Sequence, residues 1–167
     1  MPFFKDDCLT TTNAGKFGII DDNQAPGSPA YLSHNTGEDW SVIVDNPTQK
    51  TLNFYAIDKC ILFYKVNNPG NLESTCDAAL VDINTIYFIE IKDRSSSGWL
   101  AKACDQIINT IKLLKENTAP ETAPRIIGYV CNSQRPNANS SHTATMAKFY
   151  RETNGCKLFV QQVLHIE

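Results

Sequence analysis

The chain has 167 residues, of which 42% are apolar and 20% charged, and a net charge of −3. These values are ordinary for a globular protein and predict one domain, residues 1–167, with its own hydrophobic core. No stretch approaches the roughly 18 apolar residues of a membrane span, and the first residues lack a basic region followed by an apolar one. We therefore expect a cytoplasmic protein without a membrane partner.

Six cysteines are scattered along the chain, and none forms a C-x-x-C pair, which argues against a zinc site. Four of them fall in apolar stretches, and we expect all six to be reduced, mostly buried thiols of a cytoplasmic protein. The three histidines have no Ser or Cys partner at a recognisable spacing, so a triad hydrolase is not supported. The cysteines are Cys8, Cys60, Cys76, Cys104, Cys131 and Cys156.

Charge is unevenly distributed along the chain. Residues 1–91 hold 5 Lys and Arg against 12 Asp and Glu, whereas residues 92–157 hold 10 against 5. An acidic net charge is unusual for a protein that binds nucleic acid, but the basic second half permits a phosphate-binding face. An ordinary solvated surface is the alternative reading of the same charges.

The first 39 residues are rich in turn-forming residues. Thr, Asn, Gly, Asp and Pro dominate at 10–15 and 21–29, and only Lys16–Ile20 has the pattern of a short strand. We expect a loop-rich N-terminal segment over 1–39, which covers the core or contacts a partner. The core itself is expected at 40–167.

Two apolar runs follow at 40–44 and 51–57, and the polar stretch between them predicts a β-hairpin. The Asn-Pro pair in that stretch also permits a helix that begins near Pro47. A further strand is expected at 60–66, before the turn-forming residues of 67–71.

The strongest pattern lies at 76–92, where two apolar strands meet at 83–84 and predict a hairpin. With an even loop about this centre, the numbers of cross-strand partners sum to 167, so Asp77 faces Glu90. Lys92 points to the same face, because strand side chains alternate. Two carboxylates and one ammonium group would converge there, and a divalent cation, Mg²⁺ or Mn²⁺, would relieve the repulsion between the acids.

After Lys92 the hydrophobic period changes from that of a strand to that of a helix. A polar loop with serine N-cap candidates precedes an amphipathic helix over 99–116. A buried strand over 125–131, a helix over 141–153 and a last strand over 157–165 follow. Strand, helix and strand in succession predict a parallel crossover, and the whole pattern predicts an α/β fold with a mixed β-sheet flanked by helices.

The order Asp77, then Glu90-Ile91-Lys92 one strand later, then a helix that carries Gln106, resembles the PD-(D/E)XK nuclease superfamily. The resemblance covers residues 55–131 and implies a restriction-endonuclease-like core. The chain departs from the family's sequence pattern at two positions near the motif. Cys76 stands where a proline often precedes the Asp, and Thr110 stands where some members have a Tyr.

The resemblance implies a metal-dependent nuclease that hydrolyses phosphodiester bonds, most simply those of DNA. Asp77 and Glu90 would hold one or two Mg²⁺ ions with the carbonyl of Ile91. Lys92 would orient the attacking water or neutralise the attacked phosphate. Gln106 would lie near the metal or the substrate backbone. The alternative is that Gln106 is a polar residue at the edge of the apolar helix face, without a role in the site.

Three further residues are candidates because of their place in the chain. Asp58 precedes an expected strand and would supply an extra acid, with a turn aspartate as the alternative. Arg94 and Arg135 lie in loops near the expected strand ends, where phosphate contacts would fall. The alternative is that both are ordinary surface arginines.

Two functional classes therefore compete. The complete set of Asp77, Glu90 and Lys92 favours a nuclease. The acidic net charge and the unexplained residues 1–39 favour a member of the same fold without turnover, which would bind a protein or a nucleic acid in defence, immunity or regulation. A metal-free structural domain would require Asp77 and Glu90 on opposite faces of the sheet. A homodimer or another protein partner is compatible with either class.

Overall fold

The computed structural model describes residues 3–22, 25, 27–93, 97–118, 124–134 and 142–167. Within these ranges the chain forms twelve strands, two α-helices and a short 3-10 helix at Asp6–Cys8. The helices are α1 (Trp99–Glu116) and α2 (Thr143–Glu152). The strands are β1 (Leu9–Thr12), β2 (Lys16–Ile20), β3 (Tyr31–Ser33), β4 (Val42–Asp45), β5 (Leu52–Ala56), β6 (Tyr64–Lys65), β7 (Asn68–Leu72), β8 (Ala78–Val81), β9 (Thr85–Lys92), β10 (Arg125–Asn132), β11 (Lys157–Val160) and β12 (Val163–His165).

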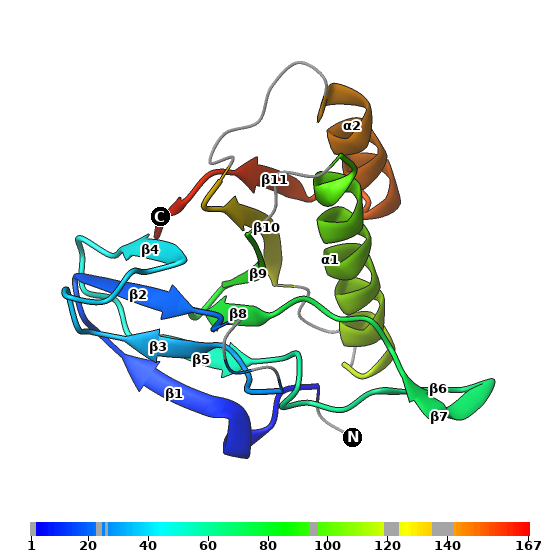
Figure 1. Cartoon of the computed structure of the whole chain (residues 1–167), viewed down its shortest axis with the longest axis horizontal. Coiled ribbons are helices and arrows are strands. Elements are labelled where there is room, and N and C mark those ends of the chain that lie inside the picture. The colour runs from blue at the N-terminus through cyan, green and yellow to red at the C-terminus, as the bar shows by residue number, and fades with distance from the viewer. Residues whose placement is uncertain (1–2, 23–24, 26, 94–96, 119–123, 135–141) are drawn as a thin grey trace.

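A six-stranded mixed sheet forms the centre of the molecule, in the order β1-β5-β8-β9-β10-β11. Its first four strands pair antiparallel, and β9, β10 and β11 pair parallel. A second sheet has the order β12-β4-β2-β3, and β6 pairs with β7 in a small hairpin that projects from the body of the molecule (Figure 1). The α/β class and the mixed, helix-flanked sheet predicted from the sequence are confirmed.

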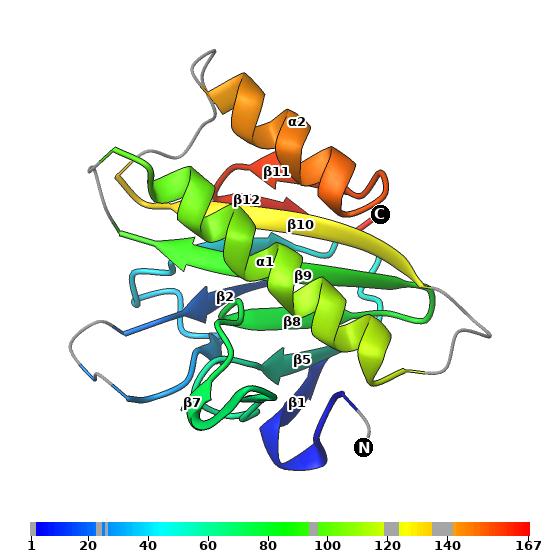
Figure 2. The ribbon, with the colours of Figure 1, turned by 90° about the vertical axis from the view of Figure 1, so that its right-hand side faces the viewer.

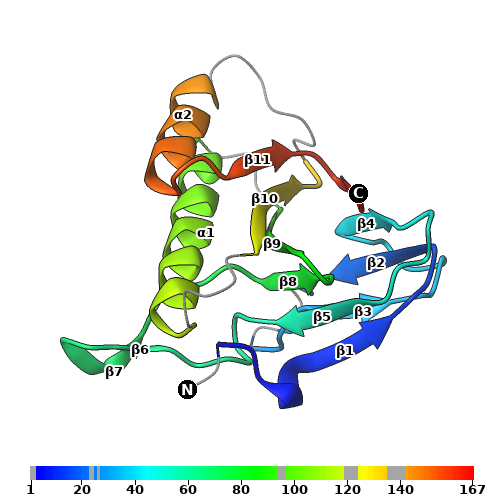
Figure 3. The ribbon, with the colours of Figure 1, turned by 180° about the vertical axis from the view of Figure 1, so that it is seen from behind.

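The two helices lie on one face of the central sheet and the second sheet lies on the other (Figures 1 and 3). A hydrophobic core lies on each face of the central sheet. Strand β9 contributes side chains to both cores, because successive side chains of a strand point to opposite faces. Ile86 and Phe88 pack toward the helices, whereas Tyr87 and Ile89 pack toward the second sheet. Figure 2 shows α1 lying across β9 and β10. Neither of the described helices is long and apolar enough to cross a membrane.

The hairpin predicted at 76–92 is confirmed together with its register. Four cross-strand pairs run from Ala78 opposite Ile89 to Val81 opposite Ile86, and the numbers in each pair sum to 167. The helix predicted at 99–116 is confirmed as α1, although Gly98, with a φ of 78°, occupies its N-cap in place of a serine. The parallel pairing of β9 with β10 confirms the predicted crossover.

The hairpin predicted from 40–44 and 51–57 is wrong, and no helix begins near Pro47. Strand β4 belongs to the second sheet and β5 to the central sheet. The fully buried Asn46 redirects the chain between them: its side-chain amide donates hydrogen bonds to the carbonyls of Ala14 and Lys50, at 3.1 and 2.9 Å. The contact with Ala14 joins segments 32 residues apart, so the local pattern did not predict it.

Three more sequence predictions are wrong in the outer parts of the fold. The segment 1–39 was expected to be loop-rich with one strand, but it supplies β1, β2 and β3. The strand expected at 60–66 is reduced to β6, because part of the expected turn at 67–71 pairs with it as β7. The last strand, expected over 157–165, is divided into β11 and β12, which belong to different sheets.

Cys8 and Cys60 form a disulfide, so the prediction that all cysteines are reduced is wrong for these two. The bond spans 52 residues and joins segments that the pairing of β1 with β5 brings together, which spacing alone does not reveal. The other four cysteines are free, and all but Cys156 are buried. Because disulfides persist mainly in oxidising compartments, the cytoplasmic location stays a prediction that this bond argues against.

We predict that reducing the disulfide, or replacing Cys8 with Ser, lowers the free energy of unfolding by about 4 kcal/mol, because the unfolded chain gains the entropy of an open loop of this length. Urea unfolding with and without a dithiol reductant measures the difference. The matched control is Cys156→Ser, which should leave stability almost unchanged. Equal stability of the oxidised and reduced wild type would contradict the prediction.

Candidate functional site

A cavity of about 260 Å³ opens where β8 begins and β9 ends, beneath α1. Five carboxylates and two ammonium groups line it, so the net charge of its lining is negative when all are ionised. Six of its lining residues were predicted from the sequence, and three were not. The lining residues are Asp21, Asp58, Lys59, Asp77, Glu90, Ile91, Lys92, Asp93 and Gln106.

Asp77 and Glu90 lie side by side on the face of the central sheet that α1 covers. Asp77 directly precedes the pair of Ala78 and Ile89 and thus continues the register toward Glu90. Its carboxylate accepts a 2.6 Å hydrogen bond from the backbone N–H of Ile91. Asp77 is 8% exposed and Glu90 is fully buried. The opposite-face arrangement that a metal-free structural domain would require is therefore not found.

Lys92 is held between two acceptors inside the cavity. Its ammonium group donates to one carboxylate oxygen of Glu90 and, at 2.8 Å, to the side-chain oxygen of Gln106. The amide of Gln106 in turn donates to the carbonyl of Thr75 at 3.0 Å. Gln106 is thus more than a polar residue at the edge of a helix face, because it connects α1 to Lys92 and to the segment before β8.

Thr110 fastens α1 to the chain just before Asp77. Its fully buried hydroxyl accepts a 2.8 Å hydrogen bond from the N–H of Cys76 and donates one of 2.8 Å to the carbonyl of Gln106. Burial raises the pKa of the Cys76 thiol well above its usual value, so this side chain is neutral and serves in packing. The two positions that depart from the family pattern therefore have structural roles here.

Burial raises the pKa of both facing acids. The pKa of Asp77 rises to about 7, because loss of hydration outweighs the hydrogen bond from Ile91 and the attraction of Lys92. The pKa of Glu90 rises well above its usual value, first through burial and then through the nearby charge of Asp77, and Lys92 offsets this only in part. The single ammonium group at this point does not neutralise the two carboxylates.

One oxygen of Glu90, Oε2, is buried and has no hydrogen-bond partner among the described residues. Leaving a buried carboxylate oxygen unpaired is costly, and a cation would relieve that cost. No group of three or more His, Cys, Asp or Glu side chains in the described ranges could hold a metal by itself. The two carboxylates with the carbonyl of Ile91 nevertheless fit Mg²⁺, which binds few protein ligands and retains several waters.

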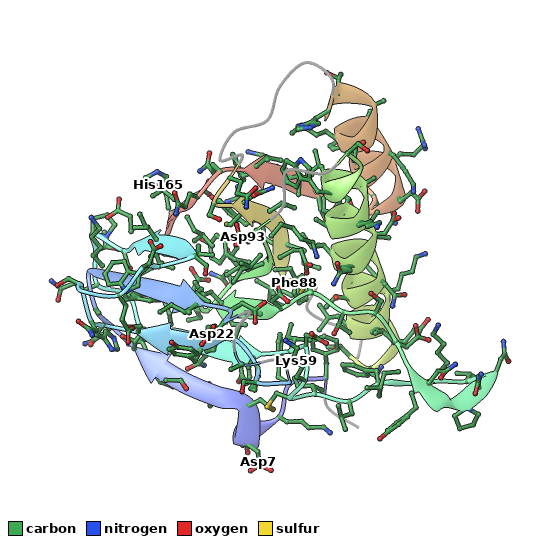
Figure 4. The ribbon with its side chains drawn as sticks, in the orientation of Figure 1. Asp7, Asp22, Lys59, Phe88, Asp93 and His165 are labelled. Atoms are coloured by element: carbon green, nitrogen blue, oxygen red, sulfur yellow. A yellow bond between two sulfur atoms is a disulfide. The ribbon has the colours of Figure 1, made fainter. Side chains whose placement is uncertain are left out.

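Three lining residues were not predicted: Asp21, Lys59 and Asp93. The ammonium group of Lys59 lies 3.8 Å from a carboxylate oxygen of Asp21, and Asp93 accepts a 2.9 Å hydrogen bond from Ser133. Figure 4 labels Lys59 in the loop after β5 and Asp93 beyond β9. A signal existed for the two acids, since each directly follows a strand, but nothing local in the sequence marked Lys59.

The remaining sequence candidates have different outcomes. Asp58 lines the cavity, and its backbone N–H donates to the carbonyl of Cys76 at 3.2 Å. Its role as an extra acid stays a prediction. Arg94 and Arg135 lie outside the described residues, and their proposed phosphate contacts stay predictions.

No protein-family model, no curated protein and no solved structure matches this chain. The resemblance to the PD-(D/E)XK nucleases thus depends on the motif residues and on the geometry they adopt.

Because the folded pKa of Asp77 exceeds its ordinary value of 3.8, the stability linked to this group is fully present below about pH 4 and is lost as the pH rises to about 7. In EDTA, Asp77→Asn should remove this loss and be more stable than the wild type above pH 7, by about 4 kcal/mol. Urea unfolding from pH 4 to 8 measures both. The control Asp93→Asn, at an exposed acid of the same cavity, should follow the wild type. Parallel curves for all three proteins would show that burial of Asp77 does not cause the loss.

Proposed function

We propose that this protein is a metal-dependent nuclease with a restriction-endonuclease-like core. The observation that carries the proposal is the buried, unpartnered oxygen of Glu90 beside Asp77, with Lys92 held against the same carboxylate. A purely structural site would not retain two facing acids at a position where burial opposes their charge.

Each residue has a defined task in the proposed reaction. Asp77, Glu90 and the carbonyl of Ile91 would hold Mg²⁺ or Mn²⁺, which supplies positive charge and lowers the pKa of water when bound. The ammonium group of Lys92, fixed by Glu90 and Gln106, would stabilise the charge that develops on the attacked phosphate. Gln106 acts on the phosphate only through Lys92, whose ammonium group it orients.

Nucleic acid is the proposed substrate, and DNA is the simplest choice. The supporting features are the almost wholly polar lining of the cavity and the excess of basic residues over 92–157, the part of the chain that begins at Lys92. Lys and Arg on that part of the chain would contact the phosphate backbone on either side of the reacting group.

A second candidate function is a catalytically inactive binding protein of the same fold. The projecting hairpin of β6 and β7 favours it, since Tyr64, Val66 and Leu72 are exposed there, with Val66 92% exposed. Apolar side chains gathered on a projecting hairpin are typical of a surface that binds another protein.

We predict that the protein cleaves DNA in Mg²⁺ or Mn²⁺, and that Glu90→Gln and Lys92→Met each lower the rate at least about 100-fold, because both groups act on the same developing charge. Gel assays on single- and double-stranded DNA and RNA measure cleavage. The matched controls are Glu116→Gln on α1 and Lys16→Met on β2, both at exposed positions. Full activity in either site variant would remove the assignment, and a wild type inert with every substrate would favour the binding protein.

A further inference from the structure

The turn over Ile57–Cys60 places a lysine in a backbone conformation that lysine rarely adopts. The N–H of Cys60 donates to the carbonyl of Ile57 at 3.2 Å, and Lys59, the third residue of the turn, has a φ of 65°. Turns with a positive φ at this residue favour Gly or Asn, because a side chain is strained there. A long, charged side chain at such a position indicates that the side chain itself is needed.

The turn is attached at two points to the segment that leads into β8 and at a third point to the N-terminal part of the chain. The N–H groups of Ile57 and Asp58 donate to the carbonyls of Asp77 and Cys76, at 2.9 and 3.2 Å. The disulfide then fixes Cys60 to the end of the 3-10 helix before β1. The backbone around Lys59 is therefore held in place, and Lys59 lines the cavity.

The two lysines of the cavity differ in what they are free to do. The ammonium group of Lys92 is engaged by Glu90 and Gln106, and its side chain is 18% exposed. The side chain of Lys59 is 33% exposed, and its ion pair with Asp21 is long, at 3.8 Å. Lys59 is therefore the better placed of the two to meet a ligand that enters from solvent.

We propose that Lys59 binds a phosphate group of the nucleic-acid strand in this cavity, through its ammonium group and the non-bridging phosphate oxygens. The inference rests on the proposed function, because it requires a phosphodiester ligand. It adds a second cation to the site besides Lys92, and it assigns the strained turn and its disulfide the task of positioning that cation.

The test replaces Lys59 with Gly, which removes the ammonium group and suits the positive φ. The probe is a short fluorescent DNA with phosphorothioate links, single- and double-stranded, in Mg²⁺, and its affinity is measured by anisotropy over a range of salt. Lys59→Gly should bind about tenfold more weakly, with a salt slope lower by about 1, because one phosphate contact is lost. Lys59→Arg should keep both values. Lys59→Gly should also melt at the same or a higher temperature than the wild type.

Gln49→Gly is the matched control, since Gln49 has a φ of 51° and does not line the cavity. It should keep the affinity and the salt slope of the wild type. Asp21→Asn, made in the wild type and in Lys59→Gly, separates ligand binding from mere support of Asp21. It should strengthen DNA binding more when Lys59 is present if Lys59 contacts phosphate, and equally in both proteins if Lys59 serves only to hold Asp21.

If Lys59→Gly keeps the DNA affinity and the salt slope of the wild type, the inference is overturned. The proposed nuclease function would still stand if the wild type cleaves DNA. A wild type that binds DNA through Lys59 but does not cleave it would retain the inference and remove the nuclease. A wild type that does not bind the probe at all would overturn both.

Discussion

The structure depends on one electrostatic constraint, the burial of two facing carboxylates at the open end of a hairpin. Asp77 and Glu90 are almost completely removed from water, and burial raises the pKa of each. Lys92 pairs with one oxygen of Glu90 and leaves the other without a partner among the described residues. Buried acids of this kind are retained in a folded protein where a ligand compensates their charge. This is why we place the functional site at these two acids.

The surrounding elements keep this point of the sheet in one geometry. Helix α1 is fastened to it by Gln106 and Thr110, whose hydrogen bonds reach the segment just before β8. The turn that carries Lys59 is tied to the same segment from the other side. A site built on strands and a helix, rather than on loops alone, holds its groups in the fixed positions that charge stabilisation requires.

The sequence revealed those parts of the fold that depend on local pattern. Alternation and turn chemistry placed the register of β8 and β9, and therefore Asp77 beside Glu90, and helical periodicity placed α1. Contacts between distant segments could not be read in this way. Asn46 sends β4 and β5 into different sheets, and the pairing of β1 with β5 joins two cysteines 52 residues apart. Lys59 belongs to the same group, because the hydrogen bonds from its turn to the carbonyls of Cys76 and Asp77 bring it to the site.

Calorimetric titration of Mn²⁺ at pH 7, repeated in buffers of different ionisation enthalpy, tests the central claim most directly. Since Asp77 has a pKa of about 7 and Glu90 one well above its usual value, a metal that both acids bind must displace protons. We predict saturable binding with net release of protons, and weaker binding in Glu90→Gln, which lacks one of the two carboxylates. Absence of binding, or binding without proton release, would contradict a metal site shared by the two acids.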